Sequence, residues 1–238
     1  MESKLTELVE RLKSEAHDNL RAVVLYGSAV TGEFLVEHSD LNILCVVERA
    51  GSADLENLHA VAEWWIRQRN AAPLIFTFEE LRRSADVFSI ELLDMKRHHR
   101  MLLGEDFLAN FEVPLQLHRL QVERELRNGW LRLRQAILTA PRSNKILLQL
   151  MLDSVSTFCA LFRHAVFALG QAMPANKRQA VDAVATISGA DASAFHSILD
   201  LREGKRKRRE IDIEAALHTY LEFVEVITNE IDRRLEAR

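Results

Sequence analysis

The spacing of apolar residues changes about halfway along the chain, and this change limits the possible folds. Before about residue 110, short apolar runs alternate with segments in which apolar residues recur every three or four positions. After Pro114 only the three- and four-residue spacing remains, which is typical of amphipathic helices. The 238 residues include only 8 Gly and 4 Pro, which also favours a helix-rich chain. We therefore predict an α+β protein, with a small mixed-sheet domain over residues 1–110 and an all-helical bundle over residues 111–238.

Apolar runs and helical spacing predict the individual elements. A fourth apolar segment of the first domain, residues 87–93, fits a strand or a helix equally well. The expected strands cover residues 22–26, 41–47 and 73–78, and the expected helices of the first domain cover residues 5–12 and 55–66. The expected helices of the second domain cover residues 115–138, 146–169, 177–187, 192–201 and 213–235.

Charge and cysteine content exclude several classes of protein. The net charge of −4 provides no overall basic field, so a protein that coats nucleic acid is not expected. Cys45 and Cys159 lie in separate apolar runs without the spacing of a zinc site or a disulfide framework. No stretch resembles a secretion signal, and the most apolar helix, residues 146–169, is interrupted by Asp153 and Arg163. We expect a soluble, cytoplasmic protein that does not bind membranes.

One segment carries more chemical information than the rest. The strand over residues 22–26 leads to Gly27 and Ser28, and Asp40 and Asn42 follow on the next strand. A glycine lets the backbone approach a ligand closely, and a serine at a helix start can offer its hydroxyl to phosphate oxygens. Asp40 and Asn42 are two residues apart on an extended segment, so their side chains are expected on the same face.

This pattern resembles that of the nucleotidyltransferase superfamily, which includes DNA polymerase β, kanamycin nucleotidyltransferase and the aminoglycoside adenylyltransferases. The family pattern is Gly-Ser, a variable stretch, Asp-x-Asp on the next strand and a third carboxylate on a neighbouring strand. Residues 91–106 are similar to the segment that closes the catalytic domain in adenylyltransferases, and the helical half is similar to their substrate-binding bundle. The resemblance implies transfer of a nucleoside monophosphate from an NTP, bound with Mg²⁺, to a hydroxyl group of a small molecule or protein acceptor.

Carried over by position, the resemblance assigns nucleotide binding to Gly27, Ser28 and Ser39, and metal binding to Asp40 as the first catalytic carboxylate. Asn42 stands at the second carboxylate position and is neutral, which makes it a poor ligand for a hard cation.

The third carboxylate position also lacks an acid. The strand near residues 74–78 would place Ile75 there, and Glu79 would lie about 13 Å further along an extended strand. With two of three carboxylates missing, we expect weak, altered or absent transfer activity. The alternative is a catalytically impaired module that binds nucleotide or an interaction partner.

The general base is not identified by the motif. Asp153 shares a three- and four-residue spacing with Gln149, Thr157 and His164, so these residues could line a substrate cleft with Asp153 as the base, or face solvent. Glu123 and Glu125 are other candidate bases, although their spacing from arginines also fits ordinary surface ion pairs.

Two basic segments allow further hypotheses. Residues 205–209, Lys-Arg-Lys-Arg-Arg, could bind nucleic acid or polyphosphate, but no aromatic residue that could stack on bases lies beside them, and a solvated loop is the simpler interpretation. Residues 98–100, His-His-Arg, could contact phosphate or form the solvated end of a helix. The long amphipathic helices could also pair two chains as a homodimer.

Overall fold

The computed structural model describes residues 1–31 and 41–236, and it divides into two compact units, Met1–Leu115 and Gln116–Arg238. The first unit contains a sheet with helices on both faces, and the second consists of helices. The predicted α+β fold, with a small mixed sheet followed by a helical bundle, is confirmed. The units divide shortly after the boundary that we predicted between residues 110 and 111.

The sheet of the first unit is mixed. Its strands are β1 (Leu20–Tyr26), β2 (Asn42–Val47), β3 (Leu74–Thr77) and β4 (His99–Leu103). Among the described residues the strand order is β3-β2-β1-β4. β1 is antiparallel to β2 and to β4, whereas β2 and β3 are parallel. β1 is therefore a central strand, and the segment that follows it leaves the sheet between two neighbouring strands.

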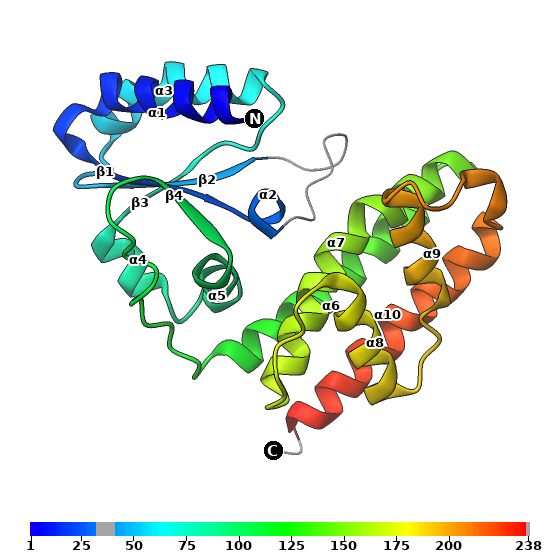
Figure 1. Ribbon diagram of the computed structural model, residues 1–238. Helices are drawn as coiled ribbons and strands as arrows, with labels where there is room; N and C mark the ends of the chain where they lie inside the picture. The colour runs from blue at the N-terminus through cyan, green and yellow to red at the C-terminus, as the bar shows by residue number, and fades with distance from the viewer. Residues whose placement is uncertain (32–40, 237–238) are drawn as a thin grey trace. The chain divides into compact units, whose positions relative to one another are not determined.

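Helices cover both faces of this sheet. They are α1 (Glu2–Ala16), α2 (Ser28–Thr31), α3 (Ser52–Arg67), α4 (Phe78–Ser84) and α5 (Ser89–Arg97), with a 3₁₀ turn at His17–Asn19. Figure 1 shows α1 and α3 on one face of the sheet and α4 and α5 on the other. The short helix α2 lies at the end of β1, and its residues Ala29 and Val30 pack against the core on the side of α1 and α3.

Alternation along the strands separates two hydrophobic cores, as expected for a sheet that is covered on both faces. Val23, Leu25, Ile43 and Cys45 pack with the leucines of α1 and with Trp65 of α3. The alternate residues, including Val24, Leu44 and Val46, pack with Leu81 of α4 and with Leu92 and Met95 of α5. In β1 and β2, all residues except Arg21, Tyr26 and Asn42 are almost fully buried. The face on which each strand residue lies is therefore well defined.

The segment that the sequence left ambiguous forms a helix and is followed by an unpredicted strand. Residues 89–97 form α5, and the apolar residues at 87 and 88 precede it, exposed to solvent. β4 begins immediately afterwards, and its residues pair with β1. β4 begins with His99 and Arg100, so it lacks the continuous apolar run from which a strand could have been predicted.

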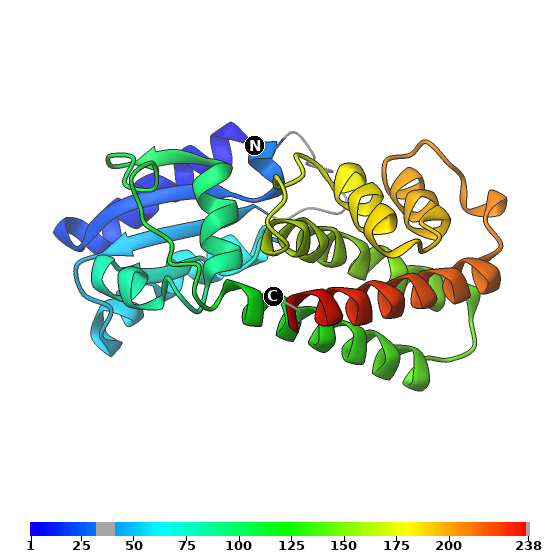
Figure 2. The ribbon, with the colours of Figure 1, turned by 90° about the horizontal axis from the view of Figure 1, so that it is seen from below.

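The second unit is a helical bundle. Its helices are α6 (His118–Thr139), α7 (Asn144–Ala168), α8 (Lys177–Ser188), α9 (Ser193–Arg202) and α10 (Ile213–Glu236), with a 3₁₀ turn at Arg208–Glu210. α7 contacts the other four helices and is the centre of the bundle, which Figure 2 shows from below in green to red. Aromatic side chains from three helices fill its core: Phe158, Phe162, Phe195, Tyr220 and Phe223.

Helix α7 corrects one expectation. By length and composition it is apolar enough to cross a membrane, although we had expected no such segment. In this structure its apolar residues contribute to the core of the bundle, because the helix packs against α6, α8, α9 and α10. The central helix of a bundle is apolar on most sides for this reason.

Candidate functional site

The turn after β1 has a backbone conformation that favours glycine. Gly27 has a φ of 80°, which lies in the left-handed region, and α2 begins at the next residue, Ser28. A Cβ added to Gly27 would lie 2.9 Å from Nδ2 of Asn42, closer than side chains normally approach. Gly27 is thus required both by its backbone angle and by its close approach to Asn42. The contact holds the turn against the beginning of β2.

The structure describes only part of the predicted site. Gly27, Ser28 and Asn42 lie together at one end of the sheet, since Tyr26 and Asn42 are paired in the register of β1 and β2. Ser39 and Asp40 lie outside the described residues.

The register of β3 corrects the expectation for the third carboxylate. Asn42 lies on the same face as Leu44 and Val46, the face that α4 and α5 cover. Ile75 pairs with Cys45 and packs on the opposite face, against the core of α1 and α3, so the prediction for Ile75 was wrong. The β3 residue paired with Leu44 is Leu74. The strand therefore offers a leucine, not a carboxylate, on the face of Asn42.

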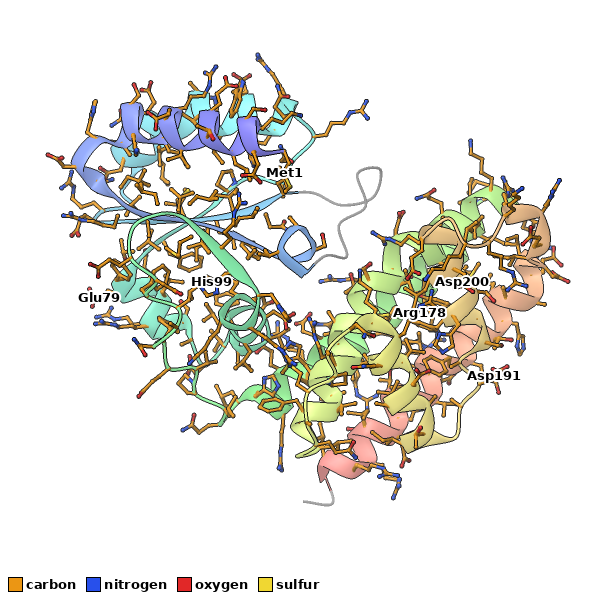
Figure 3. All side chains as sticks on the ribbon, in the orientation of Figure 1. Met1, Glu79, His99, Arg178, Asp191 and Asp200 are labelled. Atoms are coloured by element: carbon orange, nitrogen blue, oxygen red, sulfur yellow. The ribbon has the colours of Figure 1, made fainter. Side chains whose placement is uncertain are left out.

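The two glutamates that follow β3 have structural roles in helix α4. The strand ends at Thr77, so Glu79 is not a further strand residue but belongs to the first turn of the helix. Glu79 is exposed, forms an ion pair with Arg83 at 2.5 Å and is labelled on the outer side of α4 in Figure 3. Glu80 accepts a hydrogen bond from the Thr77 amide at 2.7 Å, and its own amide donates to the Thr77 hydroxyl at 3.1 Å. This reciprocal cap, made through Oε2 of Glu80, starts α4.

Three polar side chains form a row on the face of α4 and α5 at this end of the sheet. Tyr26 is paired with Asn42 on one side and with His99 of β4 on the other. Nδ1 of His99 is 2.9 Å from the Met95 carbonyl oxygen, and Nε2 is 2.9 Å from Oδ1 of Asp106. Slight desolvation opposes the charge of the exposed Asp106, but its hydrogen bonds with His99 and the Ala109 amide outweigh this and lower the pKa of the carboxyl group.

Tyr26 and Glu91 belong to this end of the sheet but were not identified from the sequence. Burial raises the pKa of Tyr26 to about 12, and the negative charge of Glu91 adds to the increase. The Tyr26 phenol is therefore neutral at physiological pH. Glu91 is an exposed residue in the first turn of α5. In the sequence, Glu91 is distinguished only as the first residue of the segment 91–106. This position does not show which face of helix α5 Glu91 occupies.

The donor set decides what kind of metal site could form. Within residues 1–31 and 41–236, no group of three or more His, Cys, Asp or Glu side chains is arranged to hold a metal ion. Asn42 contributes a neutral amide, and Leu74 contributes no ligand. A pair of divalent cations requires several carboxylates, so the described residues do not fit the two-metal arrangement.

The predicted base, Asp153, lies in the second unit. It is exposed on α7 and accepts a hydrogen bond from Gln149 at 2.7 Å. Thr157 shares this exposed side, but His164 is completely buried, with its ring centroid 5.3 Å from that of His118. The polar stripe that we predicted therefore ends before His164, which belongs to the bundle core.

Glu123, the other candidate base in this unit, interacts with charged neighbours. Its carboxylate lies 3.7 Å from Nε of Arg127, which also forms an ion pair with Asp232 of α10. Burial and the Asp232 carboxylate together raise the pKa of Glu123, against the effect of Arg127. This cluster connects α6 with α10.

Two residues of the basic segment 205–209 interact with other side chains of the second unit. Lys205 forms an ion pair with Glu203 at 2.6 Å, and Arg206 donates to the Ser197 hydroxyl at 2.7 Å. Residues 207–209 are exposed and enter a 3₁₀ turn, in which successive side chains diverge. The run therefore does not present its charges on one surface. Elsewhere in the bundle, Arg178 bridges Asp200 at 2.7 Å and Glu203 at 2.8 Å, and Arg178 and Asp200 are labelled in Figure 3.

Comparison with known proteins supports the fold. No protein-family model matches the chain, and no curated protein matches it. Among solved structures, the chain is similar to the crystal structure of spectinomycin adenyltransferase AAD(9) from Enterococcus faecialis with ATP and spectinomycin. The TM-score is 0.57, and the likeness covers 97% of this chain and 99% of that chain. At 16% sequence identity the likeness shows a common fold over almost the whole chain, with its sheet unit followed by its helical unit.

Proposed function

Since the chain has the fold of a nucleotidyltransferase, we propose that it binds a nucleoside triphosphate where β1 ends and transfers the nucleoside monophosphate to a hydroxyl group of a small molecule or protein. The observation that carries the proposal is the contact between Gly27 and Asn42. It brings the Gly-Ser turn and the start of β2 together on a fold shared with an enzyme crystallised with ATP.

Each residue near the turn has a role in this reaction. Gly27 gives the turn its left-handed backbone angle, and the Ser28 hydroxyl, at the start of α2, donates to a phosphate oxygen. Asp40 is the first carboxylate and Ser39 a neighbouring hydroxyl donor, while Asn42 offers one neutral oxygen. Mg²⁺, when bound with the nucleotide, supplies charge neutralisation for the phosphates, and Asp40 and Asn42 would hold it.

The acceptor and its base complete the reaction. The acceptor hydroxyl oxygen bonds to the α-phosphorus, the bond to the β-phosphate oxygen breaks, and pyrophosphate leaves with the electron pair. We propose Asp153 as the base that takes the hydroxyl proton, since it is an exposed carboxylate on the central helix of the bundle. The protein would act on small molecules in the cytoplasm, and a homodimer through the amphipathic helices is part of this proposal.

The second candidate function is nucleotide binding without efficient transfer. Asn42 and Leu74 stand where the family pattern has acids, and each missing carboxylate weakens cation binding. Together the two changes would reduce metal affinity by about 100-fold. We therefore expect transfer to be slow, and a protein that only senses nucleotide remains the competing hypothesis.

Calorimetric titration of the full chain with ATP, GTP, CTP and UTP, each with and without Mg²⁺, tests the proposal. We expect binding of at least one NTP, stronger with Mg²⁺, and weakened in Asp40→Ala and Ser28→Ala. Ser52→Ala, at the exposed start of α3, is the matched control and should bind as the wild type does. Binding of none of the four nucleotides under either condition would overturn both candidate functions.

A second measurement separates the enzyme from the binding module. Pyrophosphate release from ATP is followed with spectinomycin as the first acceptor, because the structurally similar enzyme was crystallised with both compounds. Release that depends on an acceptor and is lost in Asp40→Ala supports transfer. Nucleotide binding without pyrophosphate release, with any of a panel of hydroxyl-bearing acceptors, supports the binding module.

A further inference from the structure

Helix α6 exposes several large apolar side chains to solvent. Leu120 is 62% exposed, Leu131 48% and Leu138 85%. Within residues 116–236, the large apolar side chains that are exposed all belong to α6 or to its N-cap residue, Leu117. Single apolar residues are common on protein surfaces, so the arrangement of these leucines decides whether they form a site.

Three of the leucines form a straight row along α6, which we call the leucine row: Leu120, Leu131 and Leu138. Leu131 follows Leu120 by about three helical turns, and Leu138 follows Leu131 by about two. The row is therefore nearly parallel to the helix axis and about 27 Å long.

The leucine row lies on the side of α6 that faces away from the bundle. The opposite side carries the buried residues Val122, Leu126 and Leu133, and α6 contacts α7 and α10. Figure 2 shows α6, in green, at the edge of the bundle beside α10, in red. The apolar residues of α6 thus fall into two sets, one in the bundle core and one exposed.

Arginines accompany the leucine row. α6 contains five arginines and two glutamates, although the chain as a whole has a net charge of −4. Arg124 follows Leu120 by one helical turn, and Arg134 precedes Leu138 by one turn, so both lie beside the row. Both are exposed, and the Arg134 guanidinium lies 4.7 Å from the centre of the Trp130 ring. The outer face of α6 is therefore apolar along its middle and positively charged at its sides.

We propose that the leucine row and its arginines form a docking site for an acidic amphipathic helix of another protein. A helix that lies along the row would bury its own apolar side against the leucines. Its glutamates or aspartates would lie opposite Arg124 and Arg134, which is the complementary charge. A straight row five turns long favours a helix as the partner, because helices pack along such lines of side chains. The inference is independent of the proposed nucleotide transfer.

A second copy of the chain fits this face less well. Two antiparallel α6 helices that cross at Gly129 would place Leu120 opposite Leu138 of the second copy. The same arrangement would place Arg124 opposite Arg134 of the second copy, and a parallel pair in register would place each arginine opposite itself. Like charges that face each other weaken association. The charge of α6 therefore favours an acidic partner over self-association through this helix.

An anionic membrane surface also fits less well. Arg127 lies between Leu120 and Leu131, one helical turn before Leu131, and forms an ion pair with Asp232 of α10. The leucines on either side could not enter the apolar layer of a bilayer without burying this charged pair, which is unfavourable. A protein partner can place polar groups opposite the pair.

Binding of a synthetic peptide to the full chain, followed by fluorescence anisotropy, tests the inference. The probe is a labelled helical peptide of about 22 residues with leucines on one face and glutamates on both sides of them. A second peptide of the same composition has its leucines spread around the helix. We expect the first peptide to bind at least about tenfold more tightly than the second, and to bind more weakly as the salt concentration rises.

Variants show whether the leucine row is the binding surface. Leu131→Ser and Arg124→Glu should each weaken binding of the amphipathic peptide by about tenfold. Since Leu131 is exposed, Leu131→Ser should unfold at the wild-type temperature, which circular dichroism measures. Leu55→Ser, at a similarly exposed leucine on α3 of the first unit, is the matched control and should bind the peptide as the wild type does. A peptide with lysine in place of glutamate should bind the double variant Arg124→Glu, Arg134→Glu more tightly than it binds the wild type.

Four outcomes would overturn the inference. The first two are equal binding of the two leucine peptides, and wild-type affinity in Leu131→Ser. The third is a dimer in sedimentation that Leu131→Ser dissociates, which would assign the row to a second copy. The fourth is binding to phosphatidylglycerol vesicles in preference to the peptide, which would assign it to a membrane. Titration with nucleotide is a separate measurement, so none of these outcomes bears on the proposed function.

Discussion

Gly27 and Asn42 are so close that a single methyl group on the glycine would come within 2.9 Å of the asparagine Nδ2. Gly27 directly follows β1, and Asn42 is the first residue of β2, the next strand along the chain. The pairing of Tyr26 with Asn42 brings the Gly-Ser turn next to the strand position at which the family pattern has its second carboxylate. A side chain at residue 27 would require the end of the Asn42 side chain to move.

Gly27→Ala should impair both folding stability and nucleotide binding. The alanine would have to adopt a φ of 80°, and its Cβ would displace Asn42, so we expect unfolding to be easier by about 1–2 kcal/mol. Urea unfolding and ATP titration measure the two effects. Gly189→Ala is the matched control, since Gly189 has a φ of 74° but no atom within 4 Å of the added Cβ. It should lose stability and keep nucleotide affinity, and equal ATP affinity in both variants would contradict the role of Gly27.

Restoring carboxylates should increase metal affinity only if they are placed on the correct face. Asn42→Asp combined with Leu74→Glu puts two new carboxylates on the α4 and α5 face of the sheet, and we expect Mn²⁺ to bind at least about tenfold more tightly with ATP present. Asn42→Asp combined with Ile75→Glu adds the same charge, but residue 75 packs against the α1 and α3 core. This second pair should destabilise the unit and gain less metal affinity. Calorimetry and thermal unfolding measure both, and a larger gain from residue 75 would show that the assignment of faces is wrong.

Asp106 should make stability depend on pH in the acidic range. Its pKa is lowered in the folded protein, so its charged form stabilises the fold above the ordinary carboxyl pKa, and this stabilisation is lost as the pH falls through the lower, folded value. In Asp106→Asn we expect a lower melting temperature at pH 7 and a difference from the wild type that shrinks below about pH 4. Thermal unfolding at several pH values measures this. A difference that is constant from pH 3 to pH 7 would mean that the carboxylate charge is unimportant.

Glu123 should make stability depend on pH in the opposite direction to Asp106. Burial and the neighbouring Asp232 raise its pKa, so the folded protein holds the proton more tightly than the unfolded chain, and stability is lost as the pH rises through this interval. Glu123→Gln removes the charge and leaves Arg127 paired with Asp232. We expect its melting temperature at pH 7 to exceed that of the wild type by about 2 °C, with no difference below about pH 4. Glu125→Gln, two residues along the same helix, should show no such gain, and a lower melting temperature in Glu123→Gln at pH 7 would refute the argument.

The comparison of sequence and structure is most instructive at β3 and α5. An apolar run at residues 73–78 was enough to predict a strand, because buried strands consist of such runs. It was not enough to show which residues share a face with Asn42, because moving the pairing by one residue exchanges the two faces. Residues 87–93 could not be assigned because a short apolar segment suits either type of element.

By itself, the sequence determined the first three strands, the long helices, the change to an all-helical second half and the Gly-Ser turn, because these depend on local spacing and on backbone angles that few residues can adopt. Only the tertiary structure decided that β4 pairs with β1, and that Leu74 and not Ile75 shares the face of Asn42. These relationships join residues that are distant in the chain, and they arise from strand register and helix packing, which the spacing within one segment does not encode.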